Sequence, residues 1–132
     1  MNLYLLIANI LTGLALVAHT FAGDQELKVI AIDRQDTDWA RKQEKWTQAR
    51  CGWHWVSFDL LMATIGLGII NFTDWITQEA FLIKLLSGYF AGYTVFWLIT
   101  LALSKNFPKK YIKLGQWILL LVISGLLYLG SQ

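Results

Sequence analysis

Apolar residues fill four long segments of the chain, and most polar residues lie between them. The four segments cover residues 3–22, 51–73, 80–103 and 114–130. A surface helix of a soluble protein shows polar residues at every third or fourth position, and these segments mostly lack that alternation. Each segment is at or near the roughly 17 to 25 residues that a helix needs to cross a hydrocarbon core of about 30 Å. The pattern predicts an all-α integral membrane protein, a four-helix bundle forming a single domain over residues 1–132.

Composition agrees with a membrane protein and leaves no room for a separate soluble module. Of the 132 residues, 56% are hydrophobic and only one is a proline. This balance is far from that of a soluble domain, and four membrane helices use nearly the whole chain. The first apolar segment lacks a positively charged start and is longer than the apolar region of a signal peptide. We therefore interpret it as a retained helix.

The distribution of charge predicts the orientation. Ten of the eleven basic residues lie in the two loops that follow the first and the third apolar segments: Lys28, Arg34, Arg41, Lys42, Lys45, Arg50, Lys105, Lys109, Lys110 and Lys113. Loops rich in Lys and Arg stay in the cytoplasm, so both termini are expected on the extracytoplasmic side. The protein is thus predicted to be a multi-pass protein of the bacterial inner membrane. Cys51 would then lie on the reducing side, where disulfides are rare.

The loop between the first two apolar segments carries helix signals of its own. Asp36-Thr37-Asp38 is typical of a helix N-terminus, and Arg34 and Asp38 have the spacing of a helical ion pair. We expect the second helix to begin near Asp38 and to extend into the cytoplasm over residues 38–50. Six acidic and six basic residues balance the charge of residues 23–50, which argues against a nucleic-acid partner.

Tryptophans recur every seven residues along this helix, at positions 39, 46 and 53. The repeat keeps them close to one helix face. Indoles at the level of the lipid headgroups are the simpler explanation, and a face that docks a specific partner is the alternative.

Glycines and one proline mark the ends and contacts of the other helices. Gly23 followed by Asp24 is typical of a helix C-terminus and predicts the end of the first span. A turn is predicted at Asn106 and Pro108. Gly88-x-x-x-Gly92 matches a small-residue pattern for close helix packing, and we favour packing inside the bundle over dimerisation.

Ionisable residues gather where two of the membrane helices meet the cytoplasm. His19 comes just before the end of the first helix, whereas Arg50 and His54 open the second. Because these helices are antiparallel, the two imidazoles are expected at comparable depth. Arg50 and His54 are four residues apart and share a helix face. Asp59 lies about 140° round the helix from His54 at 100° per residue, and Glu26 follows Gly23 closely enough to fold back.

Four interpretations of this cluster stay open. The first is a structural polar network, since ionisable groups in lipid need partners whatever the function. The second is haem b bound by His19 and His54, with Arg50 near a propionate. The third is a transition-metal site built from His19, His54, Glu26 and Asp59. The fourth is a proton or substrate pathway in which His54 and Asp59 titrate.

The residues His19-Thr20-Phe21-Ala22-Gly23, with Arg50-x-x-Trp53-His54 about thirty residues later, carry one resemblance. They resemble an uncharacterised family of small bacterial four-span membrane proteins. In that family a His ends the first helix and an Arg-x-x-Trp-His motif opens the second. The resemblance covers roughly the first sixty residues and implies that His19, Arg50 and His54 form one site. It implies no activity.

The sequence alone favours an accessory or structural subunit of a membrane complex. Small size and helix-packing motifs suit that role, with lipid, other membrane subunits or a second copy as partners. The alternative is a redox membrane protein or enzyme that binds haem b or a metal through His19 and His54. Whether the protein is an enzyme stays open at this point.

Overall fold

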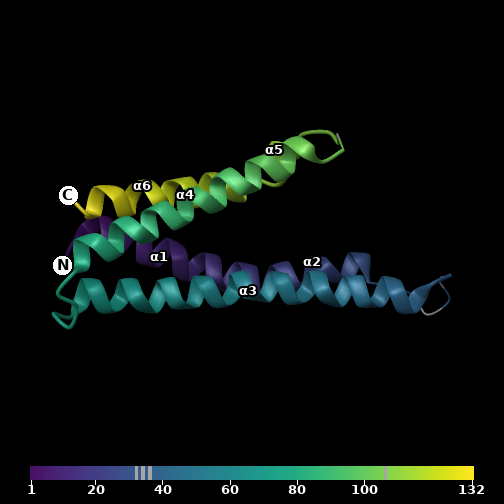
Figure 1. Cartoon of the computed structure of the whole chain (residues 1–132), viewed down its shortest axis with the longest axis horizontal. Coiled ribbons are helices and arrows are strands. Elements are labelled where there is room, and N and C mark those ends of the chain that lie inside the picture. Colours follow the sequence, from purple (N-terminus) through teal and green to yellow (C-terminus); the bar gives the residue numbers. More distant parts are fainter. Residues whose placement is uncertain (32, 34, 36, 106) are drawn as a thin grey trace. The chain divides into compact units, whose positions relative to one another are not determined.

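The described residues of the chain are helical and form no strand. The computed structural model describes residues 1–31, 33, 35, 37–105 and 107–132. Its elements, in chain order, are α1 Leu3–Val17, a π-helical segment Ala18–Gly23, α2 Asp24–Leu27, a 3₁₀ turn Lys28–Ile30, α3 Trp39–Phe72, α4 Glu79–Leu103, α5 Lys110–Lys113 and α6 Gln116–Gly130 (Figure 1). The all-α class predicted from the sequence is confirmed. The features predicted at Arg34, Asp36 and Asn106 involve positions outside the described residues.

Among the described residues, three helical runs are long and apolar enough to cross a membrane. They are Leu3–Leu27, which joins α1 to α2 through the π-helical segment, Trp39–Phe72 and Glu79–Leu103. The apolar helix Gln116–Gly130 is shorter, at 15 residues. At 1.5 Å per residue it extends about 22 Å, less than a typical hydrocarbon core. Length and composition therefore support a membrane protein with three such helices, and the fourth span stays a prediction.

The sequence predicted the start of the second helical run well and the end of the first run poorly. α3 begins at Trp39, one residue after the expected start, and continues without interruption to Phe72. The expected helix end at Gly23 is wrong. Gly23 has φ −66° and ψ −37°, which is ordinary right-handed helix, and the chain remains helical beyond it. Gly23 instead allows a side chain of α3 to pack closely against it, as described below.

The chain divides into two compact units. Unit 1 comprises Met1–Leu11 and Gly66–Gln132, and unit 2 comprises Thr12–Ile65. Helices α1 and α3 contribute residues to both. The candidate site lies entirely in unit 2.

Packing of α4 against α6 forms the centre of unit 1 (Figure 1). Ile83, Phe90, Ile123 and Leu127 are buried there. Two serines join the helices reciprocally: the Ser87 hydroxyl donates to the carbonyl oxygen of Ser124, and the Ser124 hydroxyl donates to that of Ser87, each at 2.9 Å. Small hydroxyl residues that bond across a helix pair are common in membrane bundles because they allow close approach.

The glycine pattern of α4 lies away from this packing. A Cβ added at Gly88 or at Gly92 would meet no heavy atom of the described residues within 4 Å. Within unit 1, these glycines therefore do not bring α4 and α6 together. The serines, not the glycines, make the close contact between α4 and α6.

A single residue near the N-terminus joins three elements of unit 1. The Asn2 side-chain oxygen accepts a hydrogen bond from the Tyr4 amide at 3.0 Å, which caps the start of α1. Its side-chain NH₂ donates to the Gly130 carbonyl at 2.9 Å, and its backbone N–H donates to Oδ1 of Asn71 at 2.7 Å. The two ends of the chain therefore meet within unit 1.

Candidate functional site

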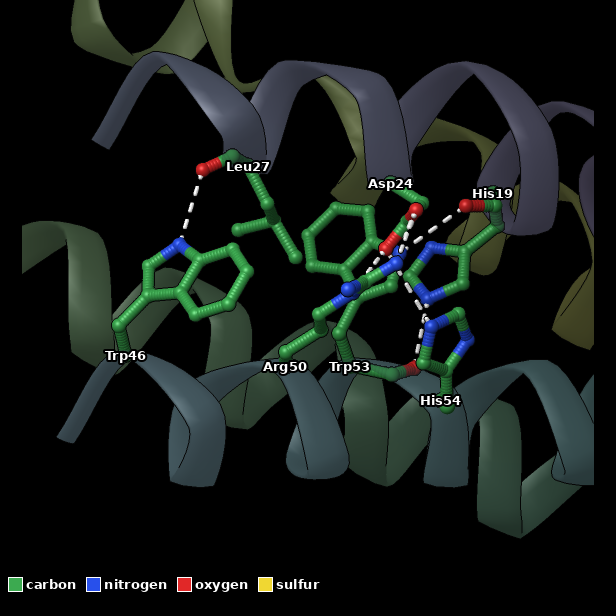
Figure 2. Close-up of polar contacts among 7 residues, drawn as sticks. All are labelled: His19, Asp24, Leu27, Trp46, Arg50, Trp53 and His54. Carbon is green, nitrogen blue, oxygen red and sulfur yellow. Dashed lines mark hydrogen bonds and ion pairs between the residues drawn. The ribbon is translucent and has the colours of Figure 1, made fainter. Parts of the chain in front are cut away.

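Asp24 is at the centre of the polar cluster in unit 2. Arg50 on α3 donates two hydrogen bonds to its carboxylate, from Nε to Oδ1 at 2.6 Å and from Nη2 to Oδ2 at 2.7 Å (Figure 2). Paired guanidinium–carboxylate bonds of this kind are among the strong hydrogen bonds in proteins and fix the geometry of both groups. The Asp24 side chain is only 17% exposed. The pair therefore ties the start of α2 to α3.

His54 and Trp46 surround the same ion pair. Nε2 of His54 lies 3.3 Å from Oδ1 of Asp24, so Arg50 and His54 share this carboxylate. The guanidinium carbon of Arg50 lies 5.5 Å from the centre of the Trp46 ring, within the range of a cation–π contact. The predicted shared face of Arg50 and His54 is confirmed, because both reach the same aspartate.

His19 and Trp53 form a second contact between the two helical runs. Their rings stack with centroids 4.1 Å apart and an angle of 5° between the planes. The Trp53 indole N–H donates to the His19 carbonyl at 2.9 Å, and Nε2 of His19 lies 3.0 Å from the Trp53 carbonyl (Figure 2). A carbonyl oxygen only accepts hydrogen bonds, so this nitrogen of His19 must carry a proton.

The π-helical segment Ala18–Gly23 explains how His19 and Asp24 both reach α3. They are five residues apart, which in a regular α-helix would place them about 140° apart round the axis. In a π-helix the backbone bonds run from residue i to residue i+5, so residues at that spacing lie above one another. The wide turn thus directs the imidazole and the carboxylate toward the same neighbour. Such turns occur often at functional sites.

Gly23 allows the indole of Trp53 to approach the backbone of this segment. A Cβ built on Gly23 would overlap the six-membered ring of Trp53. Any larger residue at this position would therefore displace the ring from the His19 stack. This contact is the physical reason for the glycine that the sequence suggested as a helix end.

A third tryptophan contact extends the pairing toward the start of α3. The Trp46 indole N–H donates to the carbonyl of Leu27 at the end of α2, at 3.1 Å (Figure 2). Trp46 and Trp53 thus use their seven-residue spacing to reach two carbonyls of the opposing helical run. Trp39, the third member of the repeat, is 47% exposed. For Trp46 and Trp53 the structure shows docking on the chain's own backbone, and their position at the lipid headgroups stays a prediction.

The structure brings together three of the five residues predicted for the site. His19, Arg50 and His54 lie around Asp24 and Trp53, whereas Glu26 is exposed. Among the described residues, no group of three or more His, Cys, Asp or Glu side chains is placed to hold a metal ion. The predicted metal site from His19, His54, Glu26 and Asp59 is therefore not assembled in this arrangement.

Haem ligation through the Nε2 nitrogens of the two histidines would require both rings to turn, and ligation through their Nδ1 nitrogens stays a prediction. Nε2 of His19 points to the Trp53 carbonyl, and Nε2 of His54 points to Asp24 (Figure 2). A haem-ligating imidazole must instead direct an unprotonated nitrogen at the iron. The proton-pathway interpretation with His54 and Asp59 stays a prediction.

Sequence reasoning missed Asp24 and the role of Trp53. Gly23 followed by Asp24 predicts a helix end, and the sequence named Glu26, not Asp24, as a partner of the cluster. The seven-residue tryptophan repeat was the available signal. Each indole N–H group needs a hydrogen-bond acceptor, and two of them find one on the helical run that carries Asp24.

Comparisons with known proteins return no relative. No protein-family model, no curated protein and no solved structure matches the chain. The resemblance to small four-span bacterial membrane proteins therefore stays a prediction, and the function must be argued from the residues themselves.

We expect Gly23→Ala to destabilise the protein by about 1 to 3 kcal/mol, the usual cost of overpacking, because the new methyl group displaces Trp53. Thermal unfolding in detergent measures the effect. Gly52→Ala is the matched control, since a Cβ there meets no atom within 4 Å. It should leave stability unchanged or raise it by roughly 0.5 to 1 kcal/mol through helix propensity. Equal effects of the two changes would show that the Trp53 contact does not matter.

Reversing one charge of the central ion pair should destabilise unit 2, and reversing both should restore it. Asp24→Arg places a cation beside Arg50 and His54, and Arg50→Asp places two carboxylates together. Each single variant should unfold at a lower temperature than the wild type, most clearly at low ionic strength, because salt screens exposed charges. The double variant should recover most of the loss. Glu26→Arg, at an exposed position, is the control; a loss as large as that of Asp24→Arg would refute a specific pair.

Proposed function

We propose that the protein is an accessory or structural subunit of a membrane complex in the bacterial inner membrane. The observation that carries this proposal is the internal pairing of the candidate site. Arg50 binds Asp24, His54 approaches the same carboxylate, and His19 and Trp53 bond to each other's backbone. The cluster holds two helical runs together.

The physical reason is the cost of polar groups near lipid. An unpaired ionisable or hydrogen-bonding group in an apolar surrounding is expensive, and pairing inside the chain removes that cost. A site that binds haem or a metal needs donor atoms directed at the ligand. Here one ring nitrogen of each histidine is directed at a protein oxygen, which gives these side chains the partners that a structural role needs.

The outward surface of α4 supports a role as a subunit. Gly88 and Gly92, one helical turn apart, leave open space where their Cβ atoms would be. Such a pair lets a second helix approach closely. Within the chain α4 packs on α6 through another face, so a helix of a partner subunit or a second copy is the proposed occupant.

For the topology, we propose four spans with both termini outside the cytoplasm. The bond between Asn2 and the Gly130 carbonyl supports termini on one side, as an even number of spans requires. The basic residues cluster in the loops around α2, the start of α3 and α5, which supports a cytoplasmic position for these loops. α6 alone is short for a span, and α5 with Leu114 and Gly115 would lengthen the fourth crossing.

The complex is tested by purification from native membranes in a mild detergent. We expect the 15.1 kDa chain to migrate on native gels with partner subunits or further copies in fixed ratio. Gly88→Leu and Gly92→Leu should release the chain from the complex. Gly125→Leu is the matched control, because Gly125 on α6 also faces open space. A monodisperse monomer, or a haem absorption band that both His19→Ala and His54→Ala abolish, would contradict the proposal.

The topology is tested by single cysteines in a Cys51→Ser background. Gln132→Cys and Lys105→Cys introduce thiols at exposed positions of the chain end and of the loop before α5. A membrane-impermeant maleimide added to intact cells with a permeabilised outer membrane should label the first and not the second. Opening the inner membrane should make the second reactive. The reverse labelling pattern would overturn the proposed orientation.

A further inference from the structure

Positive charge without a nearby acid collects in unit 1, where α4 ends and α5 follows (Figure 1). The residues are Lys105, Lys109, Lys110 and Lys113, and residues 80–132 contain no aspartate or glutamate. The acids of unit 1 are Asp74 and Glu79, which lie before α4 and at its first residue. α4 has 25 residues, which extend about 37 Å at 1.5 Å per residue. This length is several times the screening length of about 8 Å at physiological salt, so these acids do not neutralise the lysines.

The other basic loop of the chain differs in this respect. Residues 23–50 contain six acidic and six basic residues. Two of the bases pair directly with acids of the same loop: Arg50 with Asp24 and Lys45 with Glu44. Its charge is balanced, whereas that of the residues around α5 is not. An anionic partner is therefore expected at α5 rather than at residues 23–50.

One of the four lysines has a structural role. Lys110 is buried, and its ammonium donates to the carbonyls of Leu101 and Ser104 at the end of α4. It thereby satisfies carbonyls that a helix end leaves without partners. The side chains of the other three are exposed and have no hydrogen-bond or ion-pair partner among the described residues. These three form the lysine cluster: Lys105, Lys109 and Lys113.

Two tryptophans fix the backbone that carries the lysine cluster. The Trp97 indole N–H donates to the Leu114 carbonyl at 3.0 Å, and the Trp117 indole N–H donates to the Tyr111 carbonyl at 3.0 Å. Both carbonyls lie where the chain passes from α5 to α6. Tryptophan and tyrosine side chains are enriched where membrane helices meet the lipid headgroups. These contacts support a position of the lysine cluster at the headgroup level, and they hold its backbone without any ligand.

Exposed apolar side chains accompany the lysine cluster in the sequence. Leu103 is 83% exposed, Phe107 41% and Ile112 77%. A soluble anion would offer oxygens to the lysines and nothing to these side chains. A phospholipid offers both, because its phosphate adjoins the glycerol and the acyl chains. The charge and the apolar neighbours together therefore suit a lipid.

We propose that the lysine cluster binds the headgroup of an acidic phospholipid. Lys109 and Lys113 are one helical turn apart, with the Lys113 N–H donating to the Lys109 carbonyl at 2.9 Å, so both ammonium groups can reach one phosphate. Lys105 adds further positive charge, and Ile112 contacts the acyl chains. Basic residues just outside a membrane helix attract acidic lipids in this way. A zwitterionic headgroup is disfavoured, because its own ammonium would meet the lysines.

Two binding experiments on the purified full-length protein test the proposal. Native mass spectrometry compares phosphatidylglycerol with phosphatidylethanolamine of the same acyl chains, and we expect phosphatidylglycerol to be retained by roughly tenfold or more. Thermal shift compares a short-chain phosphatidylglycerol with glycerol 3-phosphate, which carries the phosphate without acyl chains. Only the lipid should stabilise the protein saturably. Equal retention of the two lipids, or equal stabilisation by glycerol 3-phosphate, would overturn the acidic lipid as the occupant.

A charge-matched pair of variants locates the site. Replacing each member of the lysine cluster by glutamine removes three positive charges and leaves Lys110 in place. This triple variant should lose the preference for phosphatidylglycerol. The control removes three positive charges at exposed positions of unit 2 and should keep the preference. Its changes are Lys28→Gln, Arg41→Gln and Lys45→Gln.

The apolar contact is tested separately by Ile112→Ser, which leaves every charge unchanged. It should weaken the retention of both lipids and preserve the preference for phosphatidylglycerol, because the apolar contact is common to the two lipids. Unchanged retention would overturn the contact assigned to Ile112.

Folding of each variant is checked by its unfolding temperature without added lipid. A wild-type preference in the folded triple variant of the lysine cluster, or an equal loss in the unit 2 control, would overturn the assignment to α5. This inference does not depend on the proposed subunit role, since a monomer would bind the lipid equally well.

Discussion

Lipid offers no hydrogen bonds, and this single constraint explains most of the polar contacts in the chain. Every donor or acceptor placed among apolar helices must find a partner in the protein or carry a cost. In unit 2 the constraint is met by the pairing of Arg50 with Asp24 and by the reciprocal bonds of His19 and Trp53. Removing one member of such a set leaves the other polar group without its hydrogen-bond partner, so these residues act as a group.

The same constraint organises unit 1 through side chains that bond to backbone carbonyls. Ser87 and Ser124 exchange hydrogen bonds between α4 and α6. Lys110 is buried at 8% exposure, and its ammonium donates to the carbonyls of Leu101 and Ser104 at the end of α4. A cation at this position also suits the negative end of the helix dipole. Three buried polar atoms have no hydrogen-bond partner among the described residues: Nδ2 of Asn71 in unit 1, and the hydroxyl oxygens of Thr20 and Ser57 in unit 2.

The sequence predicted the elements better than their side-chain contacts. A helix in lipid needs a long apolar surface, so the apolar runs were enough to predict the helical class. The start of α3 near Asp38 followed from the helix signals in the loop before it. The common depth of His19 and His54 followed from antiparallel helices. Asp24 could not be found in this way, because the local pattern Gly23-Asp24 usually ends a helix. Only the contact with Trp53 reveals why a glycine is needed inside a continuing helix. Likewise, Ser87 of α4 looks no different from other serines until Ser124 of α6 is placed beside it.

The wide turn at Ala18–Gly23 has a consequence for comparing this chain with other sequences. A π-helical turn accommodates one residue more than an α-helical turn while keeping the backbone bonded. His19 and Asp24, five residues apart, therefore occupy the relation that two residues four apart have in an α-helix. A chain with one residue fewer between its histidine and its aspartate would present the histidine to the same tryptophan and the aspartate to the same arginine without any π-helical turn. Alignments that treat a one-residue gap here as a break in the motif would thus separate proteins whose sites are physically equivalent.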